Sequence, residues 1–463
     1  MNIKQAKNVY FLGIGGIGVS ALARMLSSLG KKVWGSDNKQ SQITNRLISD
    51  GIKVIIGHSL DNLEPKPDLV IYSEDVTRDS PGFVELARLD QLGITKLTQA
   101  EAVGQLMDDK FGIGVTGTNG KSTTTAMLGL ILEAAGTDPS VLVGSLLSAK
   151  NESEKFKANA RLGTGQFFVA ESDEYARKML KNHPKMIVVT NIAEDHLDYY
   201  KDLNDIKEAF RQYIHSLPKD GILIYNADDH NTIEVCRNAS CHKFTFGIHH
   251  YADLQAINVE LREGGQRFDL HLNNVMIGEI ELCIPGVFNV ANALGAILSS
   301  IKLGIKLDVI QRTLAAYAAI WRRFEQVGKL AGKVIISDYA HHPAAITATI
   351  EAAKQFYPQK KILVVFQPHH HNRTKALFGE FVESLLSAPD ELIIPEIFDV
   401  IGREHGEQIS SQQLVEELNK KGERAIYASD LDQCGQFIHD KISKYDVVLL
   451  MGAGDIDTLA RNL

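Results

Sequence analysis

Short apolar runs alternate with longer amphipathic stretches through the first hundred residues of the chain. The apolar runs, at residues 8–12, 32–36, 53–56 and 68–73, have the length and composition of buried strands. The stretches between them repeat apolar positions every three or four residues, which is the period of a helix. Because strands that alternate with helices form parallel sheets, we predict an α/β domain over residues 1–108.

The same alternation continues in the middle of the chain and then changes its period. Further buried strands are predicted at residues 167–170, 186–190 and 221–225. Between residues 253 and 284, apolar side chains occupy every second position, which predicts antiparallel strands along one edge of this part. We therefore predict a central domain over residues 109–318.

The last part of the chain, residues 319–463, returns to the alternation of strands and helices. The strands predicted there lie at residues 334–337, 362–366, 391–394, 425–427 and 446–451. This pattern is typical of a doubly wound, Rossmann-like α/β domain. A chain of 463 residues is long enough for about three domains. The predicted fold class is therefore α/β, with Rossmann-like domains at both ends of a central parallel-sheet domain.

Composition and charge narrow the function classes. The chain carries 49 basic and 57 acidic residues, a net charge of −8, which favours neither nucleic acid nor an anionic membrane as a partner. Its four cysteines form no C-x-x-C pair, which argues against a disulfide framework and against a cysteine metal site. Glycines follow the first apolar run at once, so we expect neither a signal peptide nor a membrane span. A cytoplasmic location is the expectation.

The clearest candidate site is the segment 116–122, Thr-Gly-Thr-Asn-Gly-Lys-Ser, where a predicted strand meets a helix. Glycines let several backbone N–H groups face one anion, and a helix N-terminus favours negative charge. Lys121, expected to be exposed on this loop, can neutralise phosphate oxygens, and the Ser122 hydroxyl can bind Mg²⁺. Val115 stands where the usual motif has its first glycine, and an Asn-Gly turn before a helix is the simpler alternative.

A second glycine motif follows the first predicted strand. Gly13, Gly15 and Gly18 satisfy G-x-G-x-x-G, and Asp37 ends the next strand about twenty residues later. This arrangement predicts a cradle for a dinucleotide or a nucleotide diphosphate, with Asp37 at a ribose hydroxyl. The motif does not distinguish NAD from UDP, and a purely structural turn is the other interpretation.

Two acidic clusters, residues 171–174 and 191–198, follow strands of the central domain. The carboxyl ends of parallel strands form the ligand-binding edge of such a sheet, and Lys121 and Ser122 lie at the same edge. Carboxylates and the imidazole of His196 would there hold one or two Mg²⁺ ions against ATP phosphates. The alternative is that these acids cap the helices that follow them.

Histidines gather after two strands of the last domain, in the segments 337–343 and 366–374. Adjacent histidines point in different directions, and no metal-binding spacing links the two segments. We therefore favour contacts to a substrate over a zinc site.

Taken in order, these segments resemble the Mur ligase family over essentially the whole chain. The resemblance is carried by GIGGIG, TGTNGKSTTT, TNIAEDHLD, PGVFNVANA, RRFE, DYAHHP and FQPHHHNRT. It implies an ATP-dependent amide ligase that joins L-alanine to UDP-N-acetylmuramate through an acyl phosphate in peptidoglycan synthesis. ATP and Mg²⁺ are the implied cofactors, and we expect a monomer or a homodimer.

The resemblance also assigns roles to individual residues. Those that would contact the nucleotide are Gly117, Thr118, Asn119, Gly120, Lys121, Ser122, Thr123, Asn289, Asn292, Arg323 and Asp338. Those that would bind the metal are Ser122, Glu171 and His196. Those around the UDP moiety are Gly15, Gly16, Gly18, Asp37, His58 and Ser73. The implied catalytic residues are Lys121, His196, Arg323, His342 and Arg373, of which the last two would lie near the incoming alanine.

The chain departs from the family pattern at several positions. Asn119 and Ser122 stand where the ligase of the first step usually carries histidine and threonine. Tyr175 replaces a serine of the acidic motif, and His370 stands where an arginine is common. Later Mur ligases carry at the position of Phe210 a lysine whose carbamate helps to hold a metal ion. A phenyl ring cannot do so, and we expect Phe210 in the core of a helix face.

Two other functions stay open. One is the recycling ligase of the same family, which joins a preformed peptide to UDP-N-acetylmuramate; the segment FQPHHHNRT favours the alanine-adding member instead. The other is a nicotinamide-dependent dehydrogenase built on the first glycine motif. It leaves Lys121 and the two acidic clusters without a role.

Overall fold

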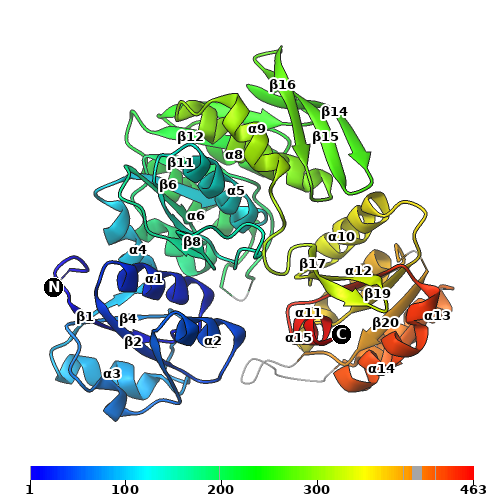
Figure 1. Ribbon diagram of the computed structural model, residues 1–463, viewed down its shortest axis with the longest axis horizontal. Helices are drawn as coiled ribbons and strands as arrows, with labels where there is room; N and C mark the ends of the chain where they lie inside the picture. Colours follow the sequence, from blue (N-terminus) through cyan, green and yellow to red (C-terminus); the bar gives the residue numbers. More distant parts are fainter. Residues whose placement is uncertain (1, 198, 389, 399–408, 423) are drawn as a thin grey trace. The chain divides into compact units, whose positions relative to one another are not determined.

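The computed structural model describes residues 2–197, 199–388, 390–398, 409–422 and 424–463, which fold into two compact units (Figure 1). The first unit holds the chain to Ile257 together with Asp269–Ile280 and Val290–Tyr317. The second unit holds Ala318–Leu463 together with Asn258–Phe268 and Glu281–Asn289. Both contain parallel sheets covered by helices, so the predicted α/β fold class is confirmed.

The first sheet lies in the N-terminal part of the first unit, and its strand order is β3-β2-β1-β4-β5, all parallel. Its strands are β1 (Asn8–Leu12), β2 (Lys32–Asp37), β3 (Lys53–Ile56), β4 (Leu69–Tyr72) and β5 (Thr95–Thr98). Its helices are α1 (Ile17–Ser28), α2 (Gln42–Ser49), α3 (Phe83–Gln91) and α4 (Gln99–Met107), with a 3-10 turn at Leu60–Leu63. The four predicted strands are confirmed. The fifth, β5, is short and only half-buried, so its apolar pattern is weak.

The second sheet has the order β16-β15-β14-β13-β12-β11-β6-β10-β7-β9-β8. Its strands are β6 (Phe111–Thr116), β7 (Ser140–Leu142), β8 (Phe156–Lys157), β9 (Ala160–Arg161), β10 (Phe167–Glu171), β11 (Met186–Val189), β12 (Ile222–Asn226), β13 (His242–Gly247), β14 (Leu254–Arg262), β15 (Gly265–Leu272) and β16 (Val275–Leu282). Strand β6 lies between β10 and β11 and is parallel to both. The segments that follow these three strands therefore meet at one edge of the sheet. Strands β14, β15 and β16 form the end of this order farthest from β8, so the predicted strands along one edge are present. Strand β14 pairs with β13 in parallel, however, and not antiparallel as the two-residue period predicts.

Helices cover this sheet and bury its apolar residues. They are α5 (Lys121–Ala134), α6 (Leu203–His215), α7 (His230–Cys236), α8 (Val287–Lys302) and α9 (Leu307–Ala315), with a 3-10 segment at Tyr175–Lys181. Phe210 on α6 is fully buried in a core cluster with Ile187, Val189 and Tyr213. The expectation of a core phenylalanine is confirmed.

The second unit contains a sheet of order β17-β18-β22-β19-β20-β21. Its strands are β17 (Glu325–Leu330), β18 (Lys333–Asp338), β19 (Ile362–Phe366), β20 (Glu391–Pro395), β21 (Ala425–Ala428) and β22 (Val447–Met451). Its helices are α10 (Pro343–Phe356), α11 (His371–Ala376), α12 (Phe378–Leu385), α13 (Ser411–Lys420), α14 (Leu431–Lys441) and α15 (Ile456–Asn462), with a 3-10 turn at Ile442–Lys444. The five predicted strands are confirmed. Strand β17, antiparallel to β18, was missed because none of its residues is fully buried and its sequence carries no apolar pattern.

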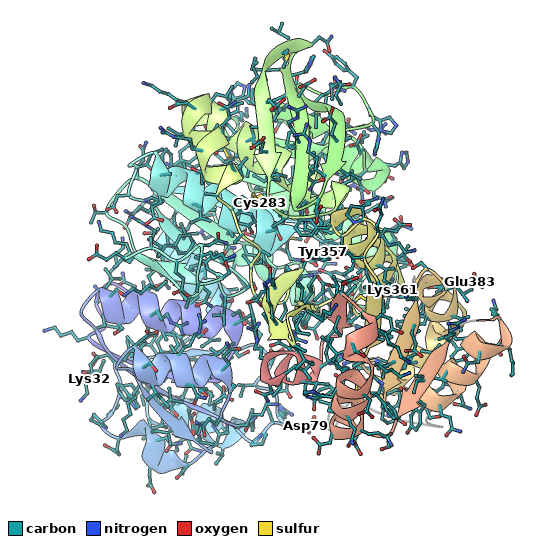
Figure 2. All side chains as sticks on the ribbon, turned by 45° about the vertical axis from the view of Figure 1, so that its right-hand side comes forward. Lys32, Asp79, Cys283, Tyr357, Lys361 and Glu383 are labelled. Atoms are coloured by element: carbon teal, nitrogen blue, oxygen red, sulfur yellow. The ribbon has the colours of Figure 1, made fainter. Side chains whose placement is uncertain are left out.

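Charged side chains lie on the outside of both units, among them Lys32 in the first and Lys361 and Glu383 in the second (Figure 2). Within the described residues, we find no helix that is both long enough and apolar enough to span a bilayer.

Candidate active site

The loop between β6 and α5 has the backbone shape of an anion cradle. Gly117 and Gly120 have φ of 136° and 85°, a region in which side chains with a Cβ are strained. A Cβ on Gly120 would also lie 2.1 Å from Oδ1 of Asn292 on α8. The predicted strand, glycine loop and helix are therefore all present. The close approach of Gly120 to α8 is more than a simple Asn-Gly turn before a helix requires.

The segment after β11 holds this loop in place. Thr118 donates its backbone N–H to the Asn191 carbonyl at 2.9 Å, and Asn119 donates to Oδ1 of the same Asn191 at 3.0 Å. The Thr190 hydroxyl donates to the Asn119 carbonyl at 2.5 Å. The loop is thus held by hydrogen bonds to the two residues that follow β11.

Lys121 is not the exposed loop lysine that the sequence predicts. Its side chain is 13% exposed, and its ammonium group lies 2.8 Å from Oε2 of Glu174, whose side chain is 2% exposed. The ammonium also donates to the carbonyls of Gly117 and Thr118, at 2.7 and 3.2 Å. Burial opposes the charged form, but the carboxylates of Glu174, Asp173 and Glu171 outweigh it and raise the pKa of Lys121. The lysine is therefore held charged at the mouth of the loop.

Ser122 and Glu171, two of the three implied metal ligands, are in direct contact. The Ser122 hydroxyl donates to Oε2 of Glu171 at 2.7 Å, and the Gly144 backbone N–H donates to the same oxygen at 2.8 Å. Burial raises the pKa of Glu171, opposed by the charge of Lys121 and the Ser122 hydrogen bond.

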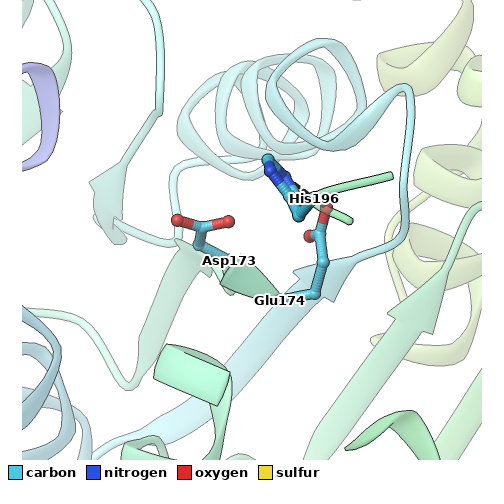
Figure 3. Close-up of side chains that lie close together, drawn as sticks. All are labelled: Asp173, Glu174 and His196. Carbon is cyan, nitrogen blue, oxygen red and sulfur yellow. Dashed lines mark ion pairs between the residues drawn. The ribbon is translucent and has the colours of Figure 1, made fainter. Parts of the chain in front are cut away.

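The third implied ligand, His196, lies beside two other acids. Asp173, Glu174 and His196 each offer a ligand atom, and these atoms lie within 4.8 Å of one another (Figure 3). Nε2 of His196 lies 3.6 Å from Oε1 of Glu174, and its ring lies against Tyr175 with 4.8 Å between the ring centroids. Burial lowers the pKa of His196, but the hydrogen bond to Glu174 and the charge of Asp195 raise it overall.

The capping alternative applies to part of these clusters. Asp173 accepts the backbone N–H of Tyr175 at 3.1 Å, as a residue at a helix start does. Helix α6, in contrast, is capped by Asp202, while Asp195 accepts the N–H of the neighbouring His196 at 2.7 Å. Asp198 lies outside the described residues.

The implied nucleotide residues on α8 are buried. Asn292 is 7% exposed, and its backbone carbonyl accepts the Thr124 hydroxyl at 3.3 Å. The Asn289 side chain donates to the Pro285 carbonyl at 2.7 Å and is also 7% exposed. Thr123 on α5 is 8% exposed.

The glycine motif after β1 forms a turn into α1, and Asp37 accepts a hydrogen bond from this loop; its predicted contact with a ribose hydroxyl stays a prediction. Gly15 donates its backbone N–H to Oδ2 of Asp37 at 2.8 Å. A Cβ on Gly15 would lie 2.8 Å from that oxygen and 2.9 Å from Cγ2 of Thr44. Gly16 precedes α1 as its N-cap, Gly18 lies in the first turn, and Ser73 lies against Gly13. The loop is therefore tight, with its N–H groups at the start of a helix.

His58 is turned inward, toward a buried carboxylate that sequence reasoning missed. Its side chain is 5% exposed, and Nδ1 lies 3.2 Å from Oε1 of the fully buried Glu85. Glu85 also accepts from the Tyr10 and Ser36 hydroxyls and from the Asn62 amide, at 2.6, 2.9 and 2.8 Å. A glutamate on an amphipathic helix gives no signal in the sequence that it faces the core.

The implied residues of the second unit differ in their surroundings. Asp338 is 7% exposed and accepts the backbone N–H groups of Phe324 and Ala340, at 2.7 and 2.8 Å. Arg323 is exposed, and its guanidinium lies 5.3 Å from the centre of the Tyr339 ring. His342 is exposed at the N-cap of α10, and Arg373 is half-buried on α11.

The chain is similar to known proteins over its whole length. Three family models match the chain: "Mur ligase family, catalytic domain" over residues 8–111, "Mur ligase middle domain" over 115–300 and "Mur ligase, glutamate ligase domain" over 322–454. The UDP-N-acetylmuramate–L-alanine ligase of Alkaliphilus metalliredigens is 39% identical over 465 aligned positions, which cover 100% of this chain and 98% of that protein.

Solved structures agree with these matches. The UDP-N-acetylmuramate-alanine ligase of Thermotoga maritima has a TM-score of 0.84 and 28% identity, over 98% of this chain and 97% of that one. A murein peptide ligase of Psychrobacter arcticus has a TM-score of 0.71 over 98% of this chain and 99% of that one, and its 23% identity shows likeness of fold alone.

Proposed function

Because the chain belongs to the Mur ligase family, we propose that it joins L-alanine to UDP-N-acetylmuramate at the expense of ATP. The observation that carries this proposal is the pairing of two nucleotide cradles in one compact unit. One is the loop that ends at Lys121 and Ser122; the other is the loop that Asp37 closes. A nicotinamide-dependent dehydrogenase would need only one of them, the loop that Asp37 closes.

The chemistry requires a carboxylate to become an electrophile. ATP would convert the carboxylate of the sugar into an acyl phosphate, which the amine of alanine then attacks with loss of phosphate. Transfer of a phosphoryl group needs alignment and neutralisation of charge more than covalent help. Lys121, held charged at the loop, would neutralise oxygens of the transferred group, and the N–H groups at the start of α5 would hold the others.

The donor set beside the loop fits Mg²⁺. Carboxylates and a hydroxyl are the oxygen ligands that this ion prefers, and they are provided by Glu171, Ser122, Asp173 and Glu174. His196 adds a ring nitrogen beside them. A cation held by these residues would supply positive charge opposite the phosphate oxygens. We keep Ser122, Glu171 and His196 as the proposed ligands, to which the geometry adds Asp173 and Glu174.

Residues of the second unit would present the amino acid. We propose, from the family likeness, that Arg323 and Asp338 act toward the nucleotide and that His342 and Arg373 act toward alanine. We place the domain limits at residues 1–108, 109–318 and 319–463. A cytoplasmic location and a monomer or homodimer belong to the same proposal.

Release of phosphate in the presence of UDP-N-acetylmuramate, ATP and single acceptors tests the function. We expect turnover with L-alanine at least about tenfold above that with L-alanyl-D-glutamyl-diaminopimelate. The reverse ratio would identify the recycling ligase. Reduction of NAD⁺ or binding of NADH would support the dehydrogenase, and we expect neither.

Replacement of Gly15 by valine is expected to weaken binding of UDP-N-acetylmuramate at least about tenfold. The added side chain would collide with Asp37 and Thr44, which lie within 3 Å of the position of its Cβ. Calorimetry with the UDP-sugar measures the effect, and the affinity for ADP should stay unchanged because the other loop is untouched. Normal binding of the UDP-sugar would place its cradle elsewhere.

A further inference from the structure

Asn159 is fully buried in the turn from β8 to β9. Its side-chain amide donates to the backbone carbonyl of Ile17 at 2.6 Å. Ile17 is the first residue of α1 and stands inside the glycine motif, next to Gly18. Asn159 therefore contacts the N-terminal nucleotide loop directly.

The backbone of the same residue leads to the other loop. The Asn159 carbonyl accepts the N–H of Val143 at 2.9 Å. The next residue, Gly144, donates to Oε2 of Glu171 at 2.8 Å, and that oxygen accepts the Ser122 hydroxyl at 2.7 Å. Four hydrogen bonds thus join Ile17 to Ser122, and they are linked covalently through Asn159 and through the Val143–Gly144 peptide.

Two features keep this path in one arrangement. Arg24, 7% exposed, donates from Nη1 to Oδ1 of Asn159 at 2.7 Å and from Nε to Asp50 at 2.7 Å. Because the arginine holds the amide oxygen, the amide nitrogen must face Ile17. On the other side, a Cβ on Gly144 would lie 2.2 Å from Oε2 of Glu171, so the backbone approaches that carboxylate as closely as glycine allows.

We propose that Asn159, oriented by Arg24, is a positioning residue that sets the distance between the two nucleotide loops. The proposal rests on the function proposed above, in which a carboxylate on one bound substrate must meet the terminal phosphate of the other. In such a reaction a displacement of about 1 Å can cost about 10²-fold in rate, even when each substrate still binds. No motif in the sequence points to either residue.

The test is the isosteric substitution Asn159→Asp. It keeps the oxygen that Arg24 binds and replaces the amide nitrogen by a second oxygen. That nitrogen donates to the Ile17 carbonyl and, at 3.4 Å, to the Ser20 hydroxyl, and the new oxygen repels the carbonyl. We expect kcat to fall between about 10- and 100-fold. We also expect the Kd of ADP and of UDP-N-acetylmuramate, each measured alone by calorimetry, to stay within about threefold of the wild-type value.

A second variant and a control separate positioning from stability. Arg24→Lys keeps a positive charge beside Asp50 but cannot donate to both partners in the same geometry, and it should show the same loss of kcat with the same intact binding. Arg46→Met removes the ion pair with Glu152, which also joins the first and middle parts of the chain at 3.1 Å. Glu152 also accepts the backbone N–H of Ala158 at 3.1 Å, a bond that the substitution leaves in place. The ion pair itself makes none of the hydrogen bonds of the path, so kcat should stay near the wild-type value.

Different outcomes would count against the positioning role of Asn159 and against the proposed function. A kcat of Asn159→Asp within threefold of wild type, or a loss of kcat fully accounted for by weaker binding of one ligand or by a smaller folded fraction, would overturn the positioning role. Should Asn159→Asp not fold, Arg24→Lys carries the same comparison. Absence of wild-type turnover with L-alanine would instead count against the proposed function, and the comparison would be repeated with whichever acceptor supports turnover.

Discussion

Replacement of Lys121 by alanine is expected to lower kcat by at least about 10³-fold while the protein still folds. The ammonium group is the cation that the structure places at the mouth of the phosphate loop, held by Glu174 and two loop carbonyls. Its removal leaves the charge of the transferred phosphoryl group without that partner. It also leaves the buried Glu174 without its counter-ion, so we expect a lower Tm as well. Steady-state kinetics and thermal unfolding measure the two effects.

Lys181→Ala is the matched control for this variant. Lys181 is 54% exposed, and its ion pair with Glu101 at 3.4 Å is of the surface type that contributes little. It should keep wild-type kcat. A Lys121→Ala enzyme within tenfold of wild type, about 1.4 kcal/mol in activation free energy, would contradict the assigned role of the lysine.

Replacement of Glu171 by glutamine is expected to lower kcat/KM by about 10²-fold at low Mg²⁺ and to raise the Mg²⁺ concentration needed for half-maximal rate. The amide oxygen of glutamine can still accept from Ser122 and Gly144, so the local structure should survive. What is lost is the negative charge that a hard cation requires. A titration of rate against Mg²⁺ at saturating ATP separates this effect from weaker nucleotide binding.

Glu234→Gln is the control for the loss of one carboxylate charge away from the phosphate loop. Its carboxylate pairs with Lys207 and Arg211, at 2.7 and 2.8 Å, and not with the phosphate loop. We expect its Mg²⁺ dependence to match wild type. If Glu171→Gln also shows an unchanged Mg²⁺ dependence, the metal is held by the trio of Asp173, Glu174 and His196 without Glu171.

The strands and both nucleotide loops could be predicted because their signals are local. A buried strand needs a run of apolar residues, and a tight turn into a helix needs glycines at set positions, so neighbours in the chain suffice to recognise them. Strands β1, β3 and β19 have the predicted limits for this reason. Strand β17 was not predicted because it is an edge strand with only two apolar side chains, Val327 and Leu330, which are partly buried and too few to give a periodic pattern.

The acidic clusters were predicted at the correct edge, but their partners were not. The sequence places Glu171, Glu174 and His196 after parallel strands, and strands of one sheet bring such segments together. Which carboxylate meets Lys121 depends on the path of the chain after β10. There Ala176 and Arg177 take left-handed conformations, with φ of 52° and 58°, which these residue types do not predict. The burial of Lys121 follows from that path.

By itself the sequence determined the three α/β parts, the two glycine loops and the chemical groups that we propose act at them, because these follow from periodicity and from residue type at short range. Only the tertiary structure decided that Glu174 neutralises Lys121, that His58 faces Glu85, and that Asn159 ties one nucleotide loop to the other. Each of these contacts joins segments far apart in the chain, and a buried polar group takes whichever partner the packing places within hydrogen-bonding distance, since leaving it without one is costly.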